Sequence, residues 1–508
     1  MNDKISVSPV IYYLVYSLLL AAITSVVPGV YGCLIGEKVG IIFVLYGCLV
    51  TLAILGFMAV SRPSRPLTLA DAVLLATIVW IVVPIAAAVP VTLALNIPFI
   101  DSWFEAVSGF TTTGLSMFSG SVDPDFHVYV PSVEELLETV LLWRSFIQWL
   151  GGLGILVIFV ALAMSAGLPP HLVGLAEGRY ERLEPSLAHS LRRLFQTYAI
   201  LTIAATIILR LSGMTWFEAV NHAMTALSTG GFSTKNASIG YYNNVVLELA
   251  VVLAMVWGTA NFATHYKVLF HFNLGALLRD CELRLLLALL TIETLLGTYF
   301  LYTHGYMVLE ALRLSFFQVA SVQSTTGFQT MDLEKAPAAF KLLLVAASLI
   351  GGAILSTAGG MKLYRFLVLL HTIWWAGRSS VAIRGEIISY KVGGKTINYD
   401  TFVQIIAVAF GYIAVWLIGT VCTMILLPKT PAIDAALEAA SAVGTIGVSV
   451  GLTGANRHVF YKLLYIGLMT LGRLEIIPYI ACYRVIAEKL HSRRKTRKTN
   501  RLQIVNKY

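Results

Sequence analysis

Ser108-Gly-Phe-Thr-Thr-Thr-Gly-Leu-Ser116 is a short stretch whose pattern returns three more times along the chain. Each copy aligns on one glycine, with a threonine two residues before it, a hydroxyl residue six before it and an apolar residue directly after it. The aligned glycines are Gly114, Gly231, Gly327 and Gly447, and the threonines are Thr112, Thr229, Thr325 and Thr445. The glycines are 117, 96 and 120 residues apart, which is too long for a solenoid and suits a repeated helical hairpin unit.

The composition is that of a membrane protein. Of the 508 residues, 57% are hydrophobic and 12% are charged, whereas a soluble domain carries about 25% charged residues. Apolar runs of about 20 residues are long enough to cross a bilayer as helices. The five cysteines are scattered through apolar surroundings without a CxxC pair, so we expect buried side chains rather than metal ligands or disulfides.

The apolar runs predict ten candidate membrane spans, at residues 9–32, 37–60, 70–97, 134–165, 190–212, 241–272, 283–303, 338–375, 401–427 and 458–486. Loops rich in Lys and Arg follow the second, fourth, sixth and eighth spans, and a basic tail begins at Lys489. The positive-inside rule places these segments and both termini in the cytoplasm of a multi-pass plasma-membrane protein. The net charge of +9 lies largely in these segments, so it indicates topology and not nucleic-acid binding.

A shorter segment of helical character precedes each glycine loop: Trp103–Phe110, Trp216–Leu227, Met307–Gln323 and Ala432–Val443. These segments are too short or too polar to cross a hydrocarbon core of about 30 Å, so we predict re-entrant helices that are buried in protein. Capping boxes are expected at Ser102–Glu105 and at Thr215–Glu218. The predicted unit is a span, a half-helix, a glycine loop and a second span, four times over.

The glycine loops have the residue types that a filter for a dehydrated cation needs. Successive backbone carbonyls can replace the water shell of an ion, and glycine allows the positive φ that such a backbone requires. Each half-helix also points its partly negative C-terminal end at the loop. A single copy would be explained by close helix packing, but four aligned copies favour a filter. The predicted ion-binding residues are Thr111, Thr112, Thr113, Gly114, Ser228, Thr229, Gly230, Gly231, Ser324, Thr325, Thr326, Gly327, Gly444, Thr445, Ile446 and Gly447.

A second glycine-rich segment interrupts the eighth span between residues 351 and 360. Its four glycines cost a helix roughly 1 kcal/mol each, which favours a broken, mobile segment over a simple contact between helices. Lys362, just after this segment, either extends its charged end toward the membrane surface or acts together with the segment. Arg473 lies inside the last span, where a charge is functional by default unless it pairs locally with Glu475.

These loops resemble the filters of the TrkH/KtrB superfamily of potassium transporters. The stretches Trp143–Gly152, Ser356–Lys362 and Leu471–Glu475 are similar to the same superfamily, and the resemblance covers almost the whole chain from about residue 70. The leading pair of spans is similar to the TrkH branch. The fourth loop departs from the pattern, with Gly444 and Ile446 where hydroxyl residues stand elsewhere.

The resemblance implies potassium as the transported ion, held at the filter residues, and no organic cofactor. Glycine at all four anchors favours potassium over sodium. The resemblance also implies a homodimer with one pore per subunit, regulated by a cytosolic ring of nucleotide-binding subunits similar to TrkA or KtrA. A gate below the filter is expected at Gly351, Gly352, Ser356, Thr357, Gly359, Gly360, Lys362 and Arg473.

We therefore expect an all-α membrane protein with about ten transmembrane helices and four pseudo-symmetric helix–pore-loop–helix repeats around one pore. The expected units are a leading two-helix unit (1–66), pore repeats at 67–180, 181–279, 280–395 with the gating loop and 396–490, and a basic cytoplasmic tail (491–508). The expected function is potassium uptake through a channel-like pore. The alternative is a secondary cation transporter, sodium-coupled or sodium-permeable, with alternating access, which usually shows two inverted halves. Because no HExxH motif occurs, an enzyme is not expected.

Overall fold

The computed structural model describes residues 4–154, 187–381, 390–393, 395–474, 478–484 and 487, which fold mainly as helices. Among the described residues, six helices are long and apolar enough to cross a membrane, or up to eight if each sharply bent pair counts as one span. The prediction of about ten spans is therefore not met in this part of the chain. The second half of the span predicted at 134–165 and the tail at 491–508 lie outside the described residues.

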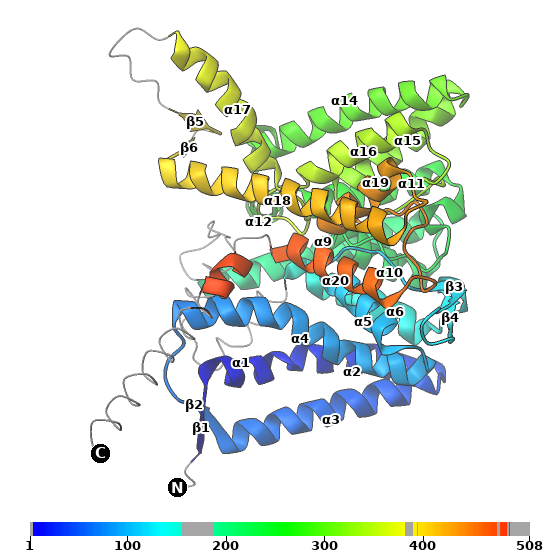
Figure 1. Cartoon of the computed structure of the whole chain (residues 1–508), viewed down its shortest axis with the longest axis vertical. Coiled ribbons are helices and arrows are strands. Elements are labelled where there is room, and N and C mark those ends of the chain that lie inside the picture. The colour runs from blue at the N-terminus through cyan, green and yellow to red at the C-terminus, as the bar shows by residue number, and fades with distance from the viewer. Residues whose placement is uncertain are drawn as a thin grey trace, which may run out of the picture.

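The chain begins with a closely packed helical pair. Helix α1 (Pro9–Ser17) continues into α2 (Leu19–Ile35), which turns back into α3 (Val39–Val60), while β1 (Ile5–Val7) pairs in parallel with β2 (Ser61–Pro63). A Cβ added to Gly40 would lie nearer than 3.0 Å to backbone atoms of Cys33 and Gly29. The two helices approach so closely because small residues line their contact. This pair lies at one edge of the molecule, with α3 outermost (Figure 1).

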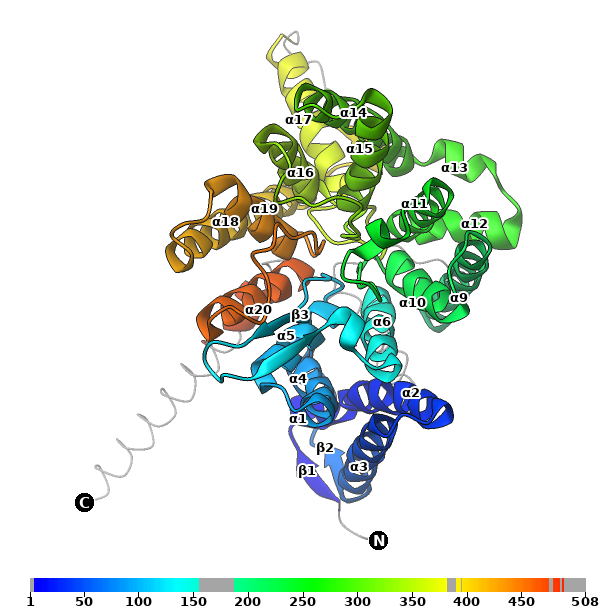
Figure 2. The same cartoon turned by 90° about the vertical axis from the view of Figure 1, so that its right-hand side faces the viewer.

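Four groups of helices follow in chain order, and each contains one glycine loop. Figure 2 shows these groups around a central zone where the loops meet. Their elements are: α4 (Leu69–Leu95), α5 (Phe99–Phe110), β3 (Ser119–Val122), β4 (Tyr129–Ser132), η1 (Val133–Glu135) and α6 (Glu138–Leu153); α9 (Leu187–Leu211), α10 (Trp216–Leu227), η2 (Ser238–Tyr242), α11 (Val245–Thr259), α12 (Phe262–His271) and α13 (Gly275–Arg279); α14 (Cys281–Thr303), α15 (Val308–Gln323), α16 (Ala338–Ile350), α17 (Leu363–Ser380), β5 (Lys391–Val392) and β6 (Lys395–Thr396); and α18 (Tyr399–Leu426), α19 (Ala432–Val443) and α20 (Val459–Leu474).

Short helices precede all four loops, as predicted, and α10 and α19 have the predicted bounds. The capping box at Thr215 and Glu218 is confirmed, because each side chain bonds the backbone N–H of the other. The one predicted at Ser102 and Glu105 is wrong. Helix α5 begins earlier, after Pro98, so that Ser102 lies inside the helix and Glu105 is free for another role.

Three predicted spans are broken. The run at 241–272 bends by 102° between α11 and α12, where Asn261 caps the new helix by accepting a hydrogen bond from Ala263 N. The run at 338–375 stops at Ile350, and α17 begins only at Leu363. The last span ends as a helix at Leu474, and Pro478–Arg484 follows at 99°. Mean hydropathy does not reveal such breaks, because the chain stays apolar through them.

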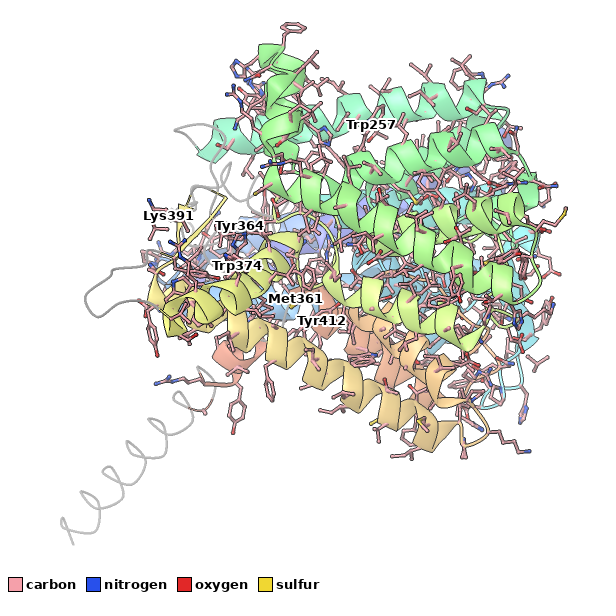
Figure 3. The ribbon with its side chains drawn as sticks, turned by 90° about the horizontal axis from the view of Figure 1, so that it is seen from above. Trp257, Met361, Tyr364, Trp374, Lys391 and Tyr412 are labelled. Atoms are coloured by element: carbon pink, nitrogen blue, oxygen red, sulfur yellow. The ribbon has the colours of Figure 1, made fainter. Side chains whose placement is uncertain are left out.

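Helix α17 and the β5–β6 hairpin extend from one side of the bundle (Figure 1). In the view from above, Tyr364 and Trp374 on α17 lie near Lys391 of the hairpin (Figure 3). The hydroxyl of Tyr390 donates to the carbonyl of Val368 over 2.6 Å, which fastens the hairpin to this helix.

Candidate functional site

The four glycine loops lie edge to edge and close into a ring. A Cβ added to any of the four anchor glycines would come nearer than 3.0 Å to a backbone carbonyl oxygen of the next loop. The oxygen always belongs to the residue directly before the neighbouring glycine. These contacts are Gly114 with Gly230, Gly231 with Thr326, Gly327 with Ile446, and Gly447 with Thr113. The last contact returns to the first loop, and no larger residue fits at any of the four glycines without a shift.

Both the anchor glycine and the threonine two residues before it have positive φ in every loop. The glycines have φ of 93°, 73°, 89° and 94°, and the threonines 55°, 52°, 57° and 50°, in chain order. Positive φ is expected for glycine, but it is a genuine outlier for a β-branched residue. The sequence predicted the first and missed the second. Such conformations cluster at functional sites, where the surroundings hold them in place.

The hydroxyl residue six before each glycine fixes the start of this backbone. Its carbonyl accepts the N–H of the residue directly before the glycine, at 2.8 Å for Ser108 and Thr225 and at 2.9 Å for Ser321 and Ser441. In the first and fourth loops, the serine Oγ also accepts the glycine N–H at 3.0 Å. In the second and third loops, the same carbonyl takes the glycine N–H at 3.3 Å.

A second position was missed in the sequence: a polar side chain stands nine residues before every anchor glycine. These four side chains, which we call the loop braces, are Glu105, His222, Gln318 and Glu438. Each one lies on the half-helix and hydrogen-bonds the chain just after the glycine. The signal was present, since each brace recurs at a fixed offset from the anchor glycine. It was hidden because Glu105 was interpreted as a helix cap.

Arg144 and Gln148 on α6 support the first two loops from behind. Gln148 donates to Gly230 O at 2.6 Å and accepts from Phe232 N at 3.0 Å. Arg144 forms an ion pair with Glu105 at 2.7 Å, donates to Ser233 O at 2.9 Å and places its guanidinium 4.1 Å from the ring centre of Phe232. Gln148 thus bonds the second loop directly, and Arg144 joins α5 to the chain after that loop.

The segment between α16 and α17 lies directly against the ring of loops. Gly359 N donates to Thr325 Oγ1 at 2.8 Å, and Thr229 Oγ1 lies 3.3 Å from Thr357 Oγ1. A Cβ on Gly359 would come nearer than 3.0 Å to Thr445 Oγ1. Three of the four positive-φ threonines therefore approach this segment directly.

Arg473 completes the contact at the fourth threonine. Its guanidinium donates to Thr112 Oγ1 at 3.0 Å, to Thr357 O at 2.9 Å and to Gly151 O at 2.7 Å. It thus joins the first loop, the segment and the end of α6. The alternative partner Glu475 lies outside the described residues.

The segment is a folded loop rather than a helix, and its glycines allow the backbones of its two ends to lie in close contact. A Cβ on Gly351 or Gly360 would come nearer than 3.0 Å to the backbone of the opposite arm, and one on Gly352 would meet Thr259. The predicted break in the helix is present, and the glycines make close contacts within the segment. Lys362 is the N-cap residue of α17 and has φ 84°, and its ammonium group donates to Ala358 O within the segment.

Bonds to the second group of helices hold the segment in place. Thr357 Oγ1 lies within donating distance of Leu227 O, at 2.8 Å, and of Gly258 O, at 2.9 Å. Ala353 N donates to Thr259 O at 3.0 Å, and Phe262 N donates to Leu355 O at 2.7 Å. The sharp bend between α11 and α12 is what exposes these backbone groups to the segment.

Two buried histidines form hydrogen bonds with neighbouring groups. His222 places Nδ1 2.8 Å from Glu218 O and Nε2 2.9 Å from Ser233 Oγ. His265 Nε2 lies 2.9 Å from Trp257 O.

Comparison with known proteins gives consistent matches along most of the chain. A family model for TrkH, described as a cation transport protein, matches residues 44–494. An uncharacterized cation transporter of Methanocaldococcus jannaschii is 27% identical over 92% of this chain and 93% of its own length. The Trk system potassium uptake protein TrkG of Escherichia coli is 30% identical over 81% of this chain and 84% of its own length. The crystal structure of the potassium transporter TrkH from Vibrio parahaemolyticus superposes with a TM-score of 0.79 and 26% identity, over 92% of this chain and 98% of that one.

Proposed function

The chain belongs to the TrkH family of cation transport proteins, and on this premise we propose that it carries potassium into the cell through one pore at the centre of the four loops. It is a membrane transporter with several apolar helices and not an enzyme. Its relatives named as Trk potassium uptake proteins support potassium as the transported ion. The observation that best supports the proposed pore is the closed ring of four loops with matching backbone conformations.

In this proposal the loop backbones form the filter. Alternating positive φ turns successive peptide groups, so that carbonyl oxygens from four loops can surround an ion that has lost its water. The C-terminal ends of α5, α10, α15 and α19 add partial negative charge on the same centre. The filter residues are those predicted from the sequence, at 111–114, 228–231, 324–327 and 444–447. Gly444 and Ile446 do not weaken the proposal, because a backbone filter uses their carbonyls and not their side chains.

The segment from Gly351 to Lys362 and Arg473 form the gate in this proposal. Their contacts with all four threonines support a barrier directly below the filter. The guanidinium of Arg473 adds a fixed positive charge there, which opposes the passage of cations. For the gate to open, the segment must break the hydrogen bond from Gly359 N to Thr325 and the bond from Arg473 to Thr357 O. The bonds of Thr357 Oγ1 with Leu227 O and Gly258 O must break as well.

The alternating-access transporter is not favoured. Such folds usually place the substrate between two inverted halves, whereas one type of glycine contact repeats four times around this ring. The four pore repeats at 67–180, 181–279, 280–395 and 396–490 remain part of the proposal, as do the homodimer, the cytosolic nucleotide-binding ring and the cytoplasmic location of both termini.

Ion flux into liposomes that hold the purified protein tests the proposal. We expect potassium uptake driven by an imposed membrane potential, which is worth about 2.3 kcal/mol per charge per 100 mV, and much slower sodium uptake. Equal rates for both ions would contradict the proposed filter, and no flux of either ion from folded protein would contradict the pore.

A further inference from the structure

The loop braces form the same hydrogen-bond pattern in three of the four loops. In those loops a serine two residues after the glycine bonds the brace: Ser116 with Glu105, Ser233 with His222 and Ser449 with Glu438. The same serine oxygen accepts the N–H of the residue four after the glycine, at 3.1 Å, 3.1 Å and 3.0 Å. The chain leaving each of these loops is thereby folded back onto its own half-helix.

The two carboxylate braces bind the backbone as well. Glu105 accepts from Met117 N and Glu438 from Val450 N, both at 3.0 Å. Glu438 further accepts from Thr453 Oγ1 at 2.5 Å. Both carboxylates are fully buried, so each of these bonds is made where water does not compete. A buried carboxylate that loses such donors is costly.

The other two braces act without a carboxylate. His222 holds its Nδ1 against Glu218 O, and a carbonyl can only accept. Nδ1 therefore carries the proton, and Nε2 is the acceptor for the Ser233 hydroxyl. Gln318 donates to Phe328 O and accepts from Thr330 N, both at 3.4 Å. Glutamate, histidine and glutamine thus all occupy the position nine residues before an anchor glycine, and each side chain offers a hydrogen-bond acceptor.

We propose that the loop braces are positioning residues for ion selectivity. The bonds from the residue six before each glycine fix the start of the filter backbone, and the brace fixes its exit. The threonines with positive φ lie between these two points, and their strain of about 1–3 kcal/mol per residue persists only where the surroundings over-determine it. The brace acts through its acceptor atoms and not through its charge. This inference rests on the proposed filter, which it deepens.

Substitutions at Glu438 test the proposal, because among the described residues this brace forms hydrogen bonds and no ion pair like that of Glu105 with Arg144. Glu438→Gln installs the side chain that the third loop uses, and it should keep the wild-type potassium-to-sodium flux ratio. Glu438→Leu should lower that ratio by about tenfold, which equals about 1.4 kcal/mol and is the size of one lost hydrogen bond. Ser449→Ala, a milder change should Glu438→Leu not fold, should lower the ratio in the same direction. Glu310→Leu, at an exposed carboxylate of another half-helix, is the control and should change nothing.

The flux ratio does not depend on how many molecules are folded, so it separates positioning from mere stability. A wild-type ratio in Glu438→Leu, or in Ser449→Ala if that variant alone folds, overturns the proposal. An equal loss in Glu438→Gln and Glu438→Leu overturns it too, because charge would then be the cause. A wild-type protein that does not discriminate potassium from sodium would instead contradict the proposed filter itself.

Discussion

Threonine occupies a backbone conformation in all four loops that glycine would adopt at no cost. At φ of 50° to 57°, each threonine carries a strain of about 1–3 kcal/mol. Its hydroxyl explains the choice, since Thr112 accepts from Arg473 and Thr325 accepts from Gly359 N. Glycine would remove the strain and also the contact with the segment below.

Gly231→Ser should lower the potassium-to-sodium flux ratio by about tenfold, as expected for a strain near 1–3 kcal/mol. The added Cβ would meet Thr326 O nearer than 3.0 Å and would resist φ of 73°. Flux into liposomes measures the ratio. Gly56→Ser is the matched control, because no atom lies within 4 Å of a Cβ at that position. An unchanged ratio in folded Gly231→Ser would exclude this glycine from the filter.

At the scale of helices, buried or partly buried ion pairs join a half-helix of one group to a helix of its neighbour. Lys341 on α16 lies 2.6 Å from Asp434 on α19, and Lys462 on α20 lies 2.5 Å from Asp101 on α5. Arg313 on α15 pairs with Glu248 on α11 at 2.7 Å. Each pair holds one end of a half-helix in place. Because the brace and the loop follow along the same helix, their positions are held as well.

Lys341→Met should destabilise the protein by about 3–5 kcal/mol, because Asp434 would keep a buried charge without a partner. Thermal unfolding in detergent measures the loss. The double variant Lys341→Met with Asp434→Leu should recover most of it, since no lone charge remains. Lys335→Met, in an exposed pair with Asp332, should cost less than about 1 kcal/mol. Similar losses in both single variants would argue against a special role for the buried pair.

Removal of part of Ala353–Gly359 should raise potassium flux in the absence of any stimulus. The segment contacts three of the threonines and is bonded to Arg473, so a shorter one can no longer cover the ring. Liposome flux measures the effect, and the size-exclusion profile serves as the check on folding. Unchanged or lower flux from a well-folded deletion variant would make the segment a packing element only.

For the molecule as a whole, the sequence predicted the four similar loops and the break at 351–360, but it missed the bend between α11 and α12. The half-helices at 216–227 and 432–443 were predicted to the residue, because capping or proline signals mark their starts. The break after Thr259 was missed, because the chain stays apolar there and Asn261 alone signals a new helix. The braces were missed since polar residues near a helix start are ordinarily caps. Which loops touch depends on contacts between distant groups, and no local pattern encodes those.

Regulation is a property of the whole molecule and gives the last prediction. The basic segments near 179–193, 378–395 and 489–501 suit a cytosolic partner with acidic surfaces, although anionic lipid competes for the same charges. We expect co-purification of a soluble nucleotide-binding partner from native membranes, and nucleotide-dependent flux only when that partner is added to the liposomes. Nucleotide sensitivity of the isolated chain would contradict this prediction, as would recovery of no soluble partner.

The ring contact also constrains which positions of the four loops can differ from one another. Each glycine touches the carbonyl of the residue before the next glycine, and every amino acid supplies that carbonyl. The residue before the glycine is therefore free to vary, as Thr113, Gly230, Thr326 and Ile446 do. The glycine itself has no such freedom, because any Cβ strikes a neighbouring copy. The side chains of each loop can therefore differ, whereas none of the four glycines can be replaced without a shift of the neighbouring loop.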